Sequence, residues 1–213
     1  PLIFYGENQA EYGNAVEENA NPQMDSKFFS QKNNSEIILG GEKLSNILNK
    51  FNFKLNDFEP YIAPKINDLM EKKIEQRYLG YYLKWDPQEC YYYAAKNTGF
   101  RPNTERTEGS YSKYSSIDDK IDPFHYLLTH IKFGLGRASY DAAQEIRNEK
   151  ITRDEGINLV KKYDSEFPNK YFREFLEYID INEKDFFSTL DSFRSPHLWK
   201  KDKNEWKLLQ KIY

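Results

Sequence analysis

Helical spacing of large apolar side chains is the feature that most constrains how this chain folds. After residue 120 such residues recur at positions i, i+3, i+4 and i+7. Apolar residues at this spacing share one helix face and are buried together. We therefore predict a mainly helical region over residues 121–213, with a core built from three stripes: Phe124, Leu127, Leu128 and Ile131; Phe172, Phe175, Leu176 and Ile179; Phe186, Leu190 and Phe193.

The chain has the length and the aromatic content for a sizeable core. Its 213 residues suit one domain or a tight pair. Only 38% of them are hydrophobic and the mean hydropathy is −0.89, but 16% are aromatic, which argues against a disordered chain. A net charge of −3 and a pI near 5.8 argue against a dedicated nucleic-acid binder.

Cysteine content and hydropathy favour a cytoplasmic protein. The single cysteine, Cys90, excludes an intramolecular disulfide and any multi-cysteine metal site, which favours a reducing compartment. No apolar stretch approaches the roughly 20 residues that span a bilayer, and no signal peptide is present. We expect neither a membrane nor a nucleic-acid partner.

The N-terminal half contains signals for strands followed by helices. The apolar run 1–5 predicts a buried strand that ends at Gly6, and residues 78–83 predict a second strand. Asp86 and Pro87 then resemble the N-cap and first position of a helix that stops at Gly99, so the second strand and helix form a βα unit. Because a lone buried strand needs neighbours, we expect further sheet-forming sequence upstream.

Other segments connect these elements. Residues 35–48 predict one helix broken at Gly40–Gly41 or two short helices, and residues 64–74 predict another helix. The polar stretch 103–120 is long for a connection, so it is either disordered or a loop that covers a substrate. We divide the chain into an α/β region (1–102), this polar loop (103–120) and the helical region (121–213).

Helix starts in the second half carry capping signals. Thr152 with Glu155 three residues later forms a capping box, and Asn182 suits the N-cap of a later helix. The segment after Ser195 carries Trp199 and Trp206, which we expect to pack back on the helices.

The first candidate site is Gly6-Glu7-Asn8, directly after the first strand. Ligands of parallel α/β sheets bind beyond the carboxyl ends of the strands, where these groups would lie. A polar exit from the strand explains the same residues and is the more frequent case for so short a motif.

The second candidate is the segment 132–139, in which two glycines lie between Lys132 and Arg137. Backbone N–H groups, an ammonium and a guanidinium at such a turn can converge on phosphate oxygens. The competing interpretation is a turn that ends a helix, with solvated cations and an ordinary i, i+4 pair between Arg137 and Asp141.

A third candidate is Asp86, which could bind substrate or metal, although the N-cap role is sufficient to explain it. The three histidines lack metal-ligand spacing, and Cys90 has no neighbouring base. Acidic residues 118, 119 and 122 could coordinate Mg²⁺, but capping of a helix start explains most of that cluster. We assign no protein metal ligand and no catalytic residue.

Taken together and in order, the motifs resemble the N-acetyl sugar amidotransferase family over nearly the whole chain. The resemblance is strongest to the branch that makes acetamidino sugars for bacterial lipopolysaccharide and for flagellin glycosylation, as in pseudaminic acid modification. It rests on these segments: Tyr5-Gly6-Glu7-Asn8, Glu11-Tyr12-Gly13, Gly40-Gly41-Glu42, residues 81–86, Gly99-Phe100, residues 132–138, residues 151–155 and Pro196-His197-Leu198-Trp199.

The resemblance implies an α/β fold, the C-terminal part of an adenine-nucleotide-hydrolase-like (ATP-pyrophosphatase) parallel-sheet enzyme. Such an amidotransferase, a ligase, would use ATP and Mg²⁺ to adenylate the oxygen of a sugar N-acetyl group. Ammonia from a glutaminase partner would then replace that oxygen. The resemblance places Gly6, Glu7 and Asn8 on the nucleotide or substrate side, and Lys132 and Arg137 at a pyrophosphate or sugar carboxylate. It implies that Asp86 binds the substrate or the magnesium ion.

One departure from the family pattern sets an expectation. Its Ser-Gly-Gly-Lys-Asp-Ser type phosphate loop and its N-terminal cysteines are absent from these 213 residues. We therefore expect the isolated chain to be inactive. Two alternatives remain open: a non-catalytic helical interaction module, and single-stranded nucleic-acid binding through stacked tyrosines, which the acidic balance disfavours.

Overall fold

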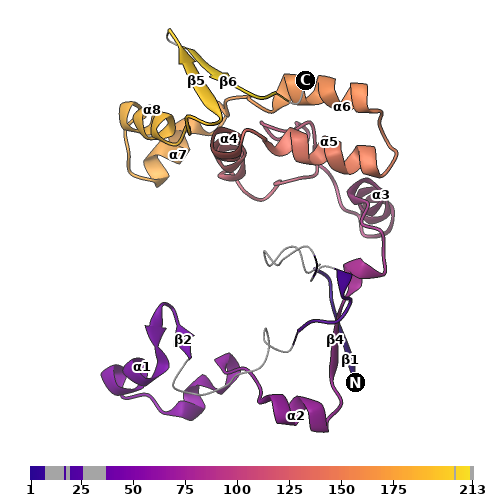
Figure 1. Ribbon diagram of the computed structural model, residues 1–213, viewed down its shortest axis with the longest axis vertical. Helices are drawn as coiled ribbons and strands as arrows, with labels where there is room; N and C mark the ends of the chain where they lie inside the picture. The colour runs from indigo at the N-terminus through magenta and orange to yellow at the C-terminus, as the bar shows by residue number, and fades with distance from the viewer. Residues whose placement is uncertain (8–16, 18–19, 26–36, 204, 212–213) are drawn as a thin grey trace. The chain divides into compact units, whose positions relative to one another are not determined.

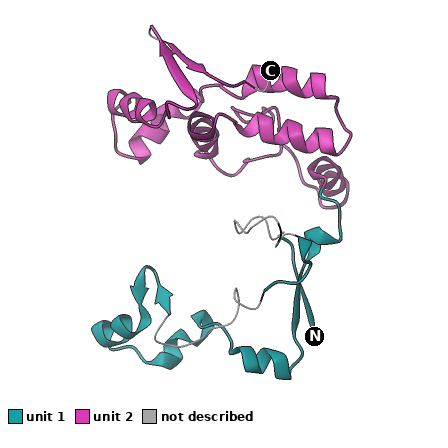
Figure 2. Ribbon diagram, in the orientation of Figure 1, with its two compact units in different colours: residues 1–85 teal, residues 86–213 magenta. Residues whose placement is uncertain are grey.

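The chain is an α/β protein of two compact units. The structure, a computed structural model, describes residues 1–7, 17, 20–25, 37–203 and 205–211. The units are Pro1–Trp85 and Asp86–Tyr213 (Figure 2), and each combines helices with a small sheet. The ATP-pyrophosphatase fold and the predicted division at residues 102 and 120 stay predictions.

The first unit contains a parallel pair of strands, β1 (Leu2–Tyr5) and β4 (Glu75–Tyr78) (Figure 1). Leu2 pairs with Glu75 at one end of the pair, and Tyr5 pairs with Tyr78 at the other. The predicted bounds of the second strand, 78–83, were wrong. The strand ends at Tyr78, because the Tyr82 amide donates to the Leu79 carbonyl (3.0 Å) and closes a 3₁₀ turn, η6 (Leu79–Tyr81).

The first strand forms where the apolar run predicted it, but its predicted burial was wrong. Leu2, Ile3 and Phe4 keep 54%, 44% and 49% of their surface exposed. Among the described residues β1 has β4 as its one strand partner, and a two-stranded sheet leaves most of its faces uncovered. Phe4 meets the ring of Tyr82 edge-on, with 5.9 Å between centroids.

A β-hairpin replaces the first half of the helix predicted over 35–48. Gly40 and Gly41 have φ angles of +58° and +82°, the pair of left-handed conformations that a two-residue hairpin turn requires. The turn joins β2 (Ile38–Leu39) to β3 (Glu42–Lys43). The described part of this unit also contains α1 (Leu44–Phe51), the 3₁₀ helix η5 (Leu55–Tyr61) and α2 (Ile66–Glu71), which lies within the predicted 64–74.

The second unit is mainly helical, as the apolar spacing predicted, and it closes with a hairpin (Figure 1). Asp86, Thr152 and Asn182 cap their helices as expected, the second as a reciprocal capping box with Glu155. The elements are α3 (Pro87–Asn97), α4 (Asp122–Phe133), α5 (Arg137–Arg147), α6 (Arg153–Tyr163), α7 (Phe172–Tyr178), α8 (Glu183–Ser192), β5 (Trp199–Asp202) and β6 (Glu205–Leu208).

The core of this unit joins α4 to α7 and α8. Ile131 is 1% exposed, and the ring of Phe124 stacks on that of Phe175 at 3.9 Å between centroids. Trp199 of the hairpin is buried and donates its indole N–H to the Ile131 carbonyl (2.7 Å), so the C-terminal segment packs on the helices as expected. The central buried residues are Leu127, Ile131, Phe186 and Leu190.

Two stripe residues lie outside this core, which corrects the prediction. Ile179 is 37% exposed and Phe193 is 39% exposed. Each is the C-cap residue of its helix, where the backbone leaves the helical path and no longer directs the side chain toward the core face. No helix of the described residues is long and apolar enough to cross a membrane.

We expect Ile131→Ala to lower the free energy of unfolding by about 2–5 kcal/mol, because it leaves a cavity in the core. Chemical denaturation of the whole chain measures this. The matched variant Ile117→Ala alters a side chain that is 41% exposed and should change stability by no more than about 0.5 kcal/mol. Equal losses in the two variants would contradict the assigned core.

Candidate functional site

The turn between α4 and α5 binds a carboxylate that the chain itself supplies. Asp164, which follows α6, is 6% exposed. Its oxygens accept the backbone N–H groups of Gly136 (2.8 Å) and Ser139 (2.9 Å) and the Ser139 hydroxyl (2.9 Å). The N–H groups that we expected to bind phosphate thus already have an anion, because a helix N-terminus attracts any carboxylate that reaches it.

Gly136 makes this close approach possible. A β-carbon at this position would lie 2.7 Å from the Asp164 carboxylate oxygen and 2.8 Å from the Asp164 carbonyl oxygen. No side chain fits there without moving the carboxylate, so the glycine serves the contact between α5 and the end of α6.

His130 of α4 is the remaining partner of this carboxylate. Its Nδ1 lies 3.4 Å from Asp164 Oδ2, and its ring packs edge-on against Trp199. Burial alone would raise the pKa of Asp164, but the nearby His130 ring and the hydrogen bonds from Gly136 and Ser139 outweigh burial and hold that pKa below its ordinary value.

A second polar group, which we call the serine–carboxylate cluster, lies on one face of α5. Arg137, Asp141 and Glu145 follow one another at four-residue spacing and so share this face. Asp141 accepts the Arg137 Nε–H (2.7 Å) with one oxygen and the hydroxyl of the fully buried Ser110 (2.6 Å) with the other. The cluster comprises Ser110, Tyr111, Tyr114, Ser115, Arg137, Asp141 and Glu145.

The Arg137 guanidinium lies among hydroxyls and aromatic rings. It is 5.3 Å from the centroid of the Tyr126 ring and 5.5 Å from that of Tyr140. Its Nη2 lies 3.5 Å from Ser115 Oγ, at the limit of a hydrogen bond. The predicted i, i+4 pair with Asp141 is therefore confirmed, and it leaves part of the guanidinium fork weakly bonded.

The cluster favours the neutral forms of Tyr111, Tyr114 and Glu145 more than water would. Burial, with the carboxylates of Glu145 and Asp141, raises the pKa of Tyr114 to about 12 and that of Tyr111 further. Burial and the charge of Asp141 raise the pKa of Glu145 as well. At neutral pH both tyrosines therefore remain hydroxyl donors.

The polar loop 103–120 carries the serines and is anchored to the helices. Arg106 forms a two-point pair with Glu166 and stacks over the Tyr163 ring at 4.5 Å. Glu166 also accepts the N–H of Gly109 (2.8 Å), whose φ of +85° suits glycine. The loop thus has defined contacts and covers one face of α5, and the prediction that it covers a substrate stays a prediction.

Asp86 acts as the N-cap of α3 and as an ion-pair partner. One oxygen accepts the Glu89 N–H (3.1 Å) and the other lies 3.2 Å from Lys150 Nζ. Burial would raise the pKa of Asp86, but these two partners lower it. A cation and an N–H group thus each bond one oxygen of this carboxylate, which accounts for Asp86 as a structural residue.

The other predicted residues have simpler surroundings. Gly6 and Glu7 are exposed after β1, and Asn8 lies outside the described residues. The ammonium of Lys132 lies 4.2 Å from the centroid of the Phe193 ring, so Lys132 and Arg137 have separate partners. Binding roles for Gly6, Glu7, Asn8, Asp86, Lys132 and Arg137 stay predictions.

Within the part of the chain that the structure describes, no three His, Cys, Asp or Glu side chains form a metal-binding group. The acidic stretch considered for Mg²⁺ serves the start of α4 instead. Asp119 accepts the Ile121 N–H (2.6 Å), and Asp122 accepts the Ser116 hydroxyl.

Sequence reasoning missed Asp164, Ser110 and Glu145. The repeat of carboxylates at Asp141 and Glu145, after Arg137, was a detectable sign of a polar helix face. No sequence pattern pointed to Asp164, because α5 and α6 separate it from the turn at Gly136 that it contacts.

The fold and the cluster define the C-terminal unit as a helical domain with a polar, hydroxyl-rich site. Residues 108–213 match the family model for the C-terminal domain of WbpG-like LPS biosynthesis proteins. At this coarse level the match supports the lipopolysaccharide-biosynthesis family that the ordered motifs indicated. No curated protein matches the chain.

We expect Asp164→Asn to lower the free energy of unfolding by about 1–3 kcal/mol at pH 7, because a charged acceptor of several hydrogen bonds is lost. The lowered pKa gives the sign of the pH dependence. The stabilisation is complete above the ordinary aspartate pKa of about 4 and is lost as the pH falls through the lower folded value.

Denaturation of both proteins between pH 7 and pH 2 measures this difference. The gap between wild type and Asp164→Asn should shrink below about pH 4. Asp118→Asn, at an exposed position, is the control and should show no gap at any pH. A pH-independent gap for Asp164→Asn would contradict the role of its charge.

Proposed function

We propose that this chain is part of an ATP-dependent N-acetyl sugar amidotransferase of bacterial surface-glycan synthesis. The observation that carries the proposal is the match of residues 108–213 to a lipopolysaccharide-biosynthesis domain, combined with the ordered motifs along the chain. The product is an acetamidino sugar for lipopolysaccharide or, as in pseudaminic acid modification, for flagellin. The reaction takes place in the cytoplasm, where ATP is available.

The chemistry proceeds in two balanced steps. The N-acetyl oxygen attacks the α-phosphorus of ATP, which forms an O–P bond and releases pyrophosphate. Ammonia from a glutaminase partner then adds to the activated carbon, and AMP leaves with the former amide oxygen. Adenylation is needed because an amide oxygen is a poor leaving group.

The serine–carboxylate cluster suits the sugar part of this task. Carboxylates, serine hydroxyls and protonated tyrosines together accept and donate hydrogen bonds, as the hydroxyls of a sugar require. The partly engaged guanidinium of Arg137 offers donors to a sugar carboxylate or a phosphate. We assign Arg137 to substrate binding and the Ser110–Asp141 pair to its positioning.

The residues of this chain do not themselves suit the triphosphate or its magnesium ion. The N-terminus of α5 already holds Asp164, and Asp86 is fully paired. These 213 residues contain no Ser-Gly-Gly-Lys-Asp-Ser type phosphate loop. We therefore expect the chain alone to bind sugar but not to catalyse amidine formation.

The decisive assay uses the complete reading frame that contains this chain, with ATP, Mg²⁺, ammonium and a nucleotide-linked N-acetyl sugar. Pyrophosphate release and the mass change from exchange of oxygen for NH are measured together. Sugar-dependent pyrophosphate release with amidine product supports the proposal. Their absence, while the protein binds another protein through the helical unit, would favour the interaction module.

We expect Arg137→Ala in the complete enzyme to reduce kcat/KM by about 10- to 100-fold, the cost of a lost charged hydrogen bond. Arg147→Ala is the matched control, because Arg147 is exposed in the last turn of the same helix. Circular dichroism establishes that both variants are folded. Equal kinetics for the two variants would remove Arg137 from the site.

A further inference from the structure

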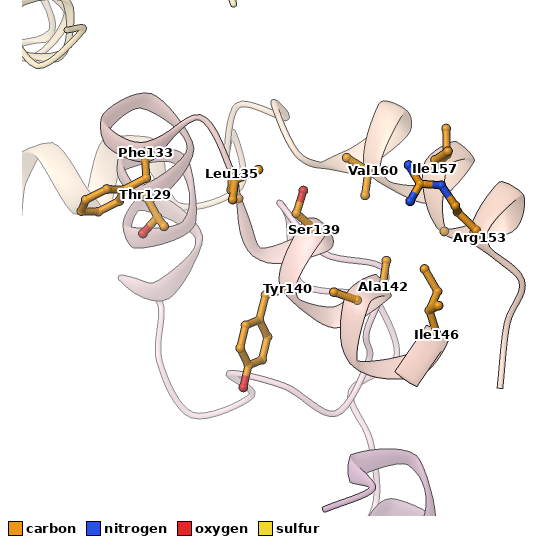
Figure 3. A pocket seen from close by; sticks show the side chains of 13 residues that line it. Thr129, Phe133, Leu135, Ser139, Tyr140, Ala142, Ile146, Arg153, Ile157 and Val160 are labelled. Carbon is orange, nitrogen blue, oxygen red and sulfur yellow. The ribbon is translucent and has the colours of Figure 1, made fainter. Parts of the chain in front are cut away.

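The face of α5 opposite the serine–carboxylate cluster lines an open apolar cavity of about 610 Å³ (Figure 3). The cavity lies between the end of α4, α5 and α6. Its floor is made of small or buried residues, chiefly Ala142, Gly156 and Val160. Gly156 allows α6 to approach α5 closely, since a β-carbon there would lie 2.8 Å from Ile146.

Large apolar side chains border the cavity and remain exposed. Phe133, Leu135 and Tyr140 keep 67%, 49% and 58% of their surface in solvent. Phe133 and Leu135 belong to the same turn whose polar groups point inward to Asp164. Apolar and aromatic side chains around a cavity are the usual lining of small-molecule binding sites.

Arg153 supplies the one charged group among the residues that line the cavity. Its guanidinium extends over the cavity beside Val160 and Ile157 (Figure 3). Among the residues that the structure describes, none forms a hydrogen bond or an ion pair with Arg153. Arg153 is also the first residue of α6, where the helix dipole favours a negative charge.

Two of the other polar side chains at the cavity already have partners elsewhere, and the third is the Tyr140 hydroxyl at its border. The Thr129 hydroxyl donates to the His125 carbonyl (2.8 Å), and the Ser139 hydroxyl donates to Asp164. No carboxylate lines the cavity. The available surface therefore consists of apolar walls, the Tyr140 hydroxyl at the border and a single cation.

We infer that this cavity binds a small ligand with an apolar body and one anionic group. The apolar body would fill the space between α5 and α6, and the anionic group would pair with Arg153. The volume lies in the range of small-molecule sites, about 300–1,000 Å³. This inference is independent of the amidotransferase proposal, because it concerns the other face of α5.

The probe is anilinonaphthalene sulfonate, an aromatic ring system that carries one sulfonate, titrated into the whole chain and followed by fluorescence. Its matched partner, phenylnaphthylamine, has the same rings without the charge. We expect saturable binding of both at one site. Arg153→Gln should weaken the sulfonate about two- to fivefold and leave the neutral probe unchanged.

Further variants test the location of the site. Ala143→Trp fills the cavity and should abolish binding of both probes. If that variant fails to fold, Ile157→Glu places a carboxylate four residues from Arg153 and should abolish sulfonate binding alone. Arg147→Gln, on α5 but outside the cavity, should bind both probes like wild type.

Three outcomes would overturn the inference. Equal affinity of the sulfonate probe for wild type and Arg153→Gln would mean that Arg153 does not bind the anionic group. Sulfonate binding that survives both Ala143→Trp and Ile157→Glu would place the probe elsewhere. A wild-type dimer in light scattering that Ala143→Trp converts to a monomer would mean that a second copy occupies the cavity.

Discussion

The capping of α5 by Asp164 is the interaction on which the C-terminal unit depends. This one carboxylate satisfies two N–H groups at the start of α5, bonds the Ser139 hydroxyl and lies beside His130 of α4. Because Asp164 follows α6, the contact ties three helices together at one buried point. The direction of α5, and with it the placement of everything on its two faces, follows from this contact.

The two faces of α5 have different chemistry and different neighbours. One presents Arg137, Asp141 and Glu145 to the serine-rich loop, which Arg106 and Glu166 anchor over it. The other presents alanines to α6 and borders the apolar cavity. A single amphipathic helix thus separates a polar site suited to sugar hydroxyls from an apolar site with one cation. The two ligands that we propose would therefore meet the same short segment of the chain from opposite sides.

Much of the second unit could be predicted from local patterns. Apolar spacing located α4, α7 and α8, and the caps at Asp86, Thr152 and Asn182 were recognisable because an N-cap bonds an amide only a few residues away. The same locality explains the errors. Gly40–Gly41 were read as a helix break, whereas paired left-handed glycines also build a hairpin turn, and the choice depends on the strands on either side.

By itself, the sequence determined the helical class of residues 121–213, most helix starts and the ordered motifs of a glycan-biosynthesis family. For the turn 132–139 it left two interpretations open, an anion site built from backbone N–H groups and a turn that ends a helix. Only the tertiary structure decided which anion binds those N–H groups. Asp164 lies 28 residues beyond Gly136 and reaches its N–H group only when α6 has packed on α5. Contacts of that kind depend on how helices pack against one another, and short-range sequence patterns do not specify that packing.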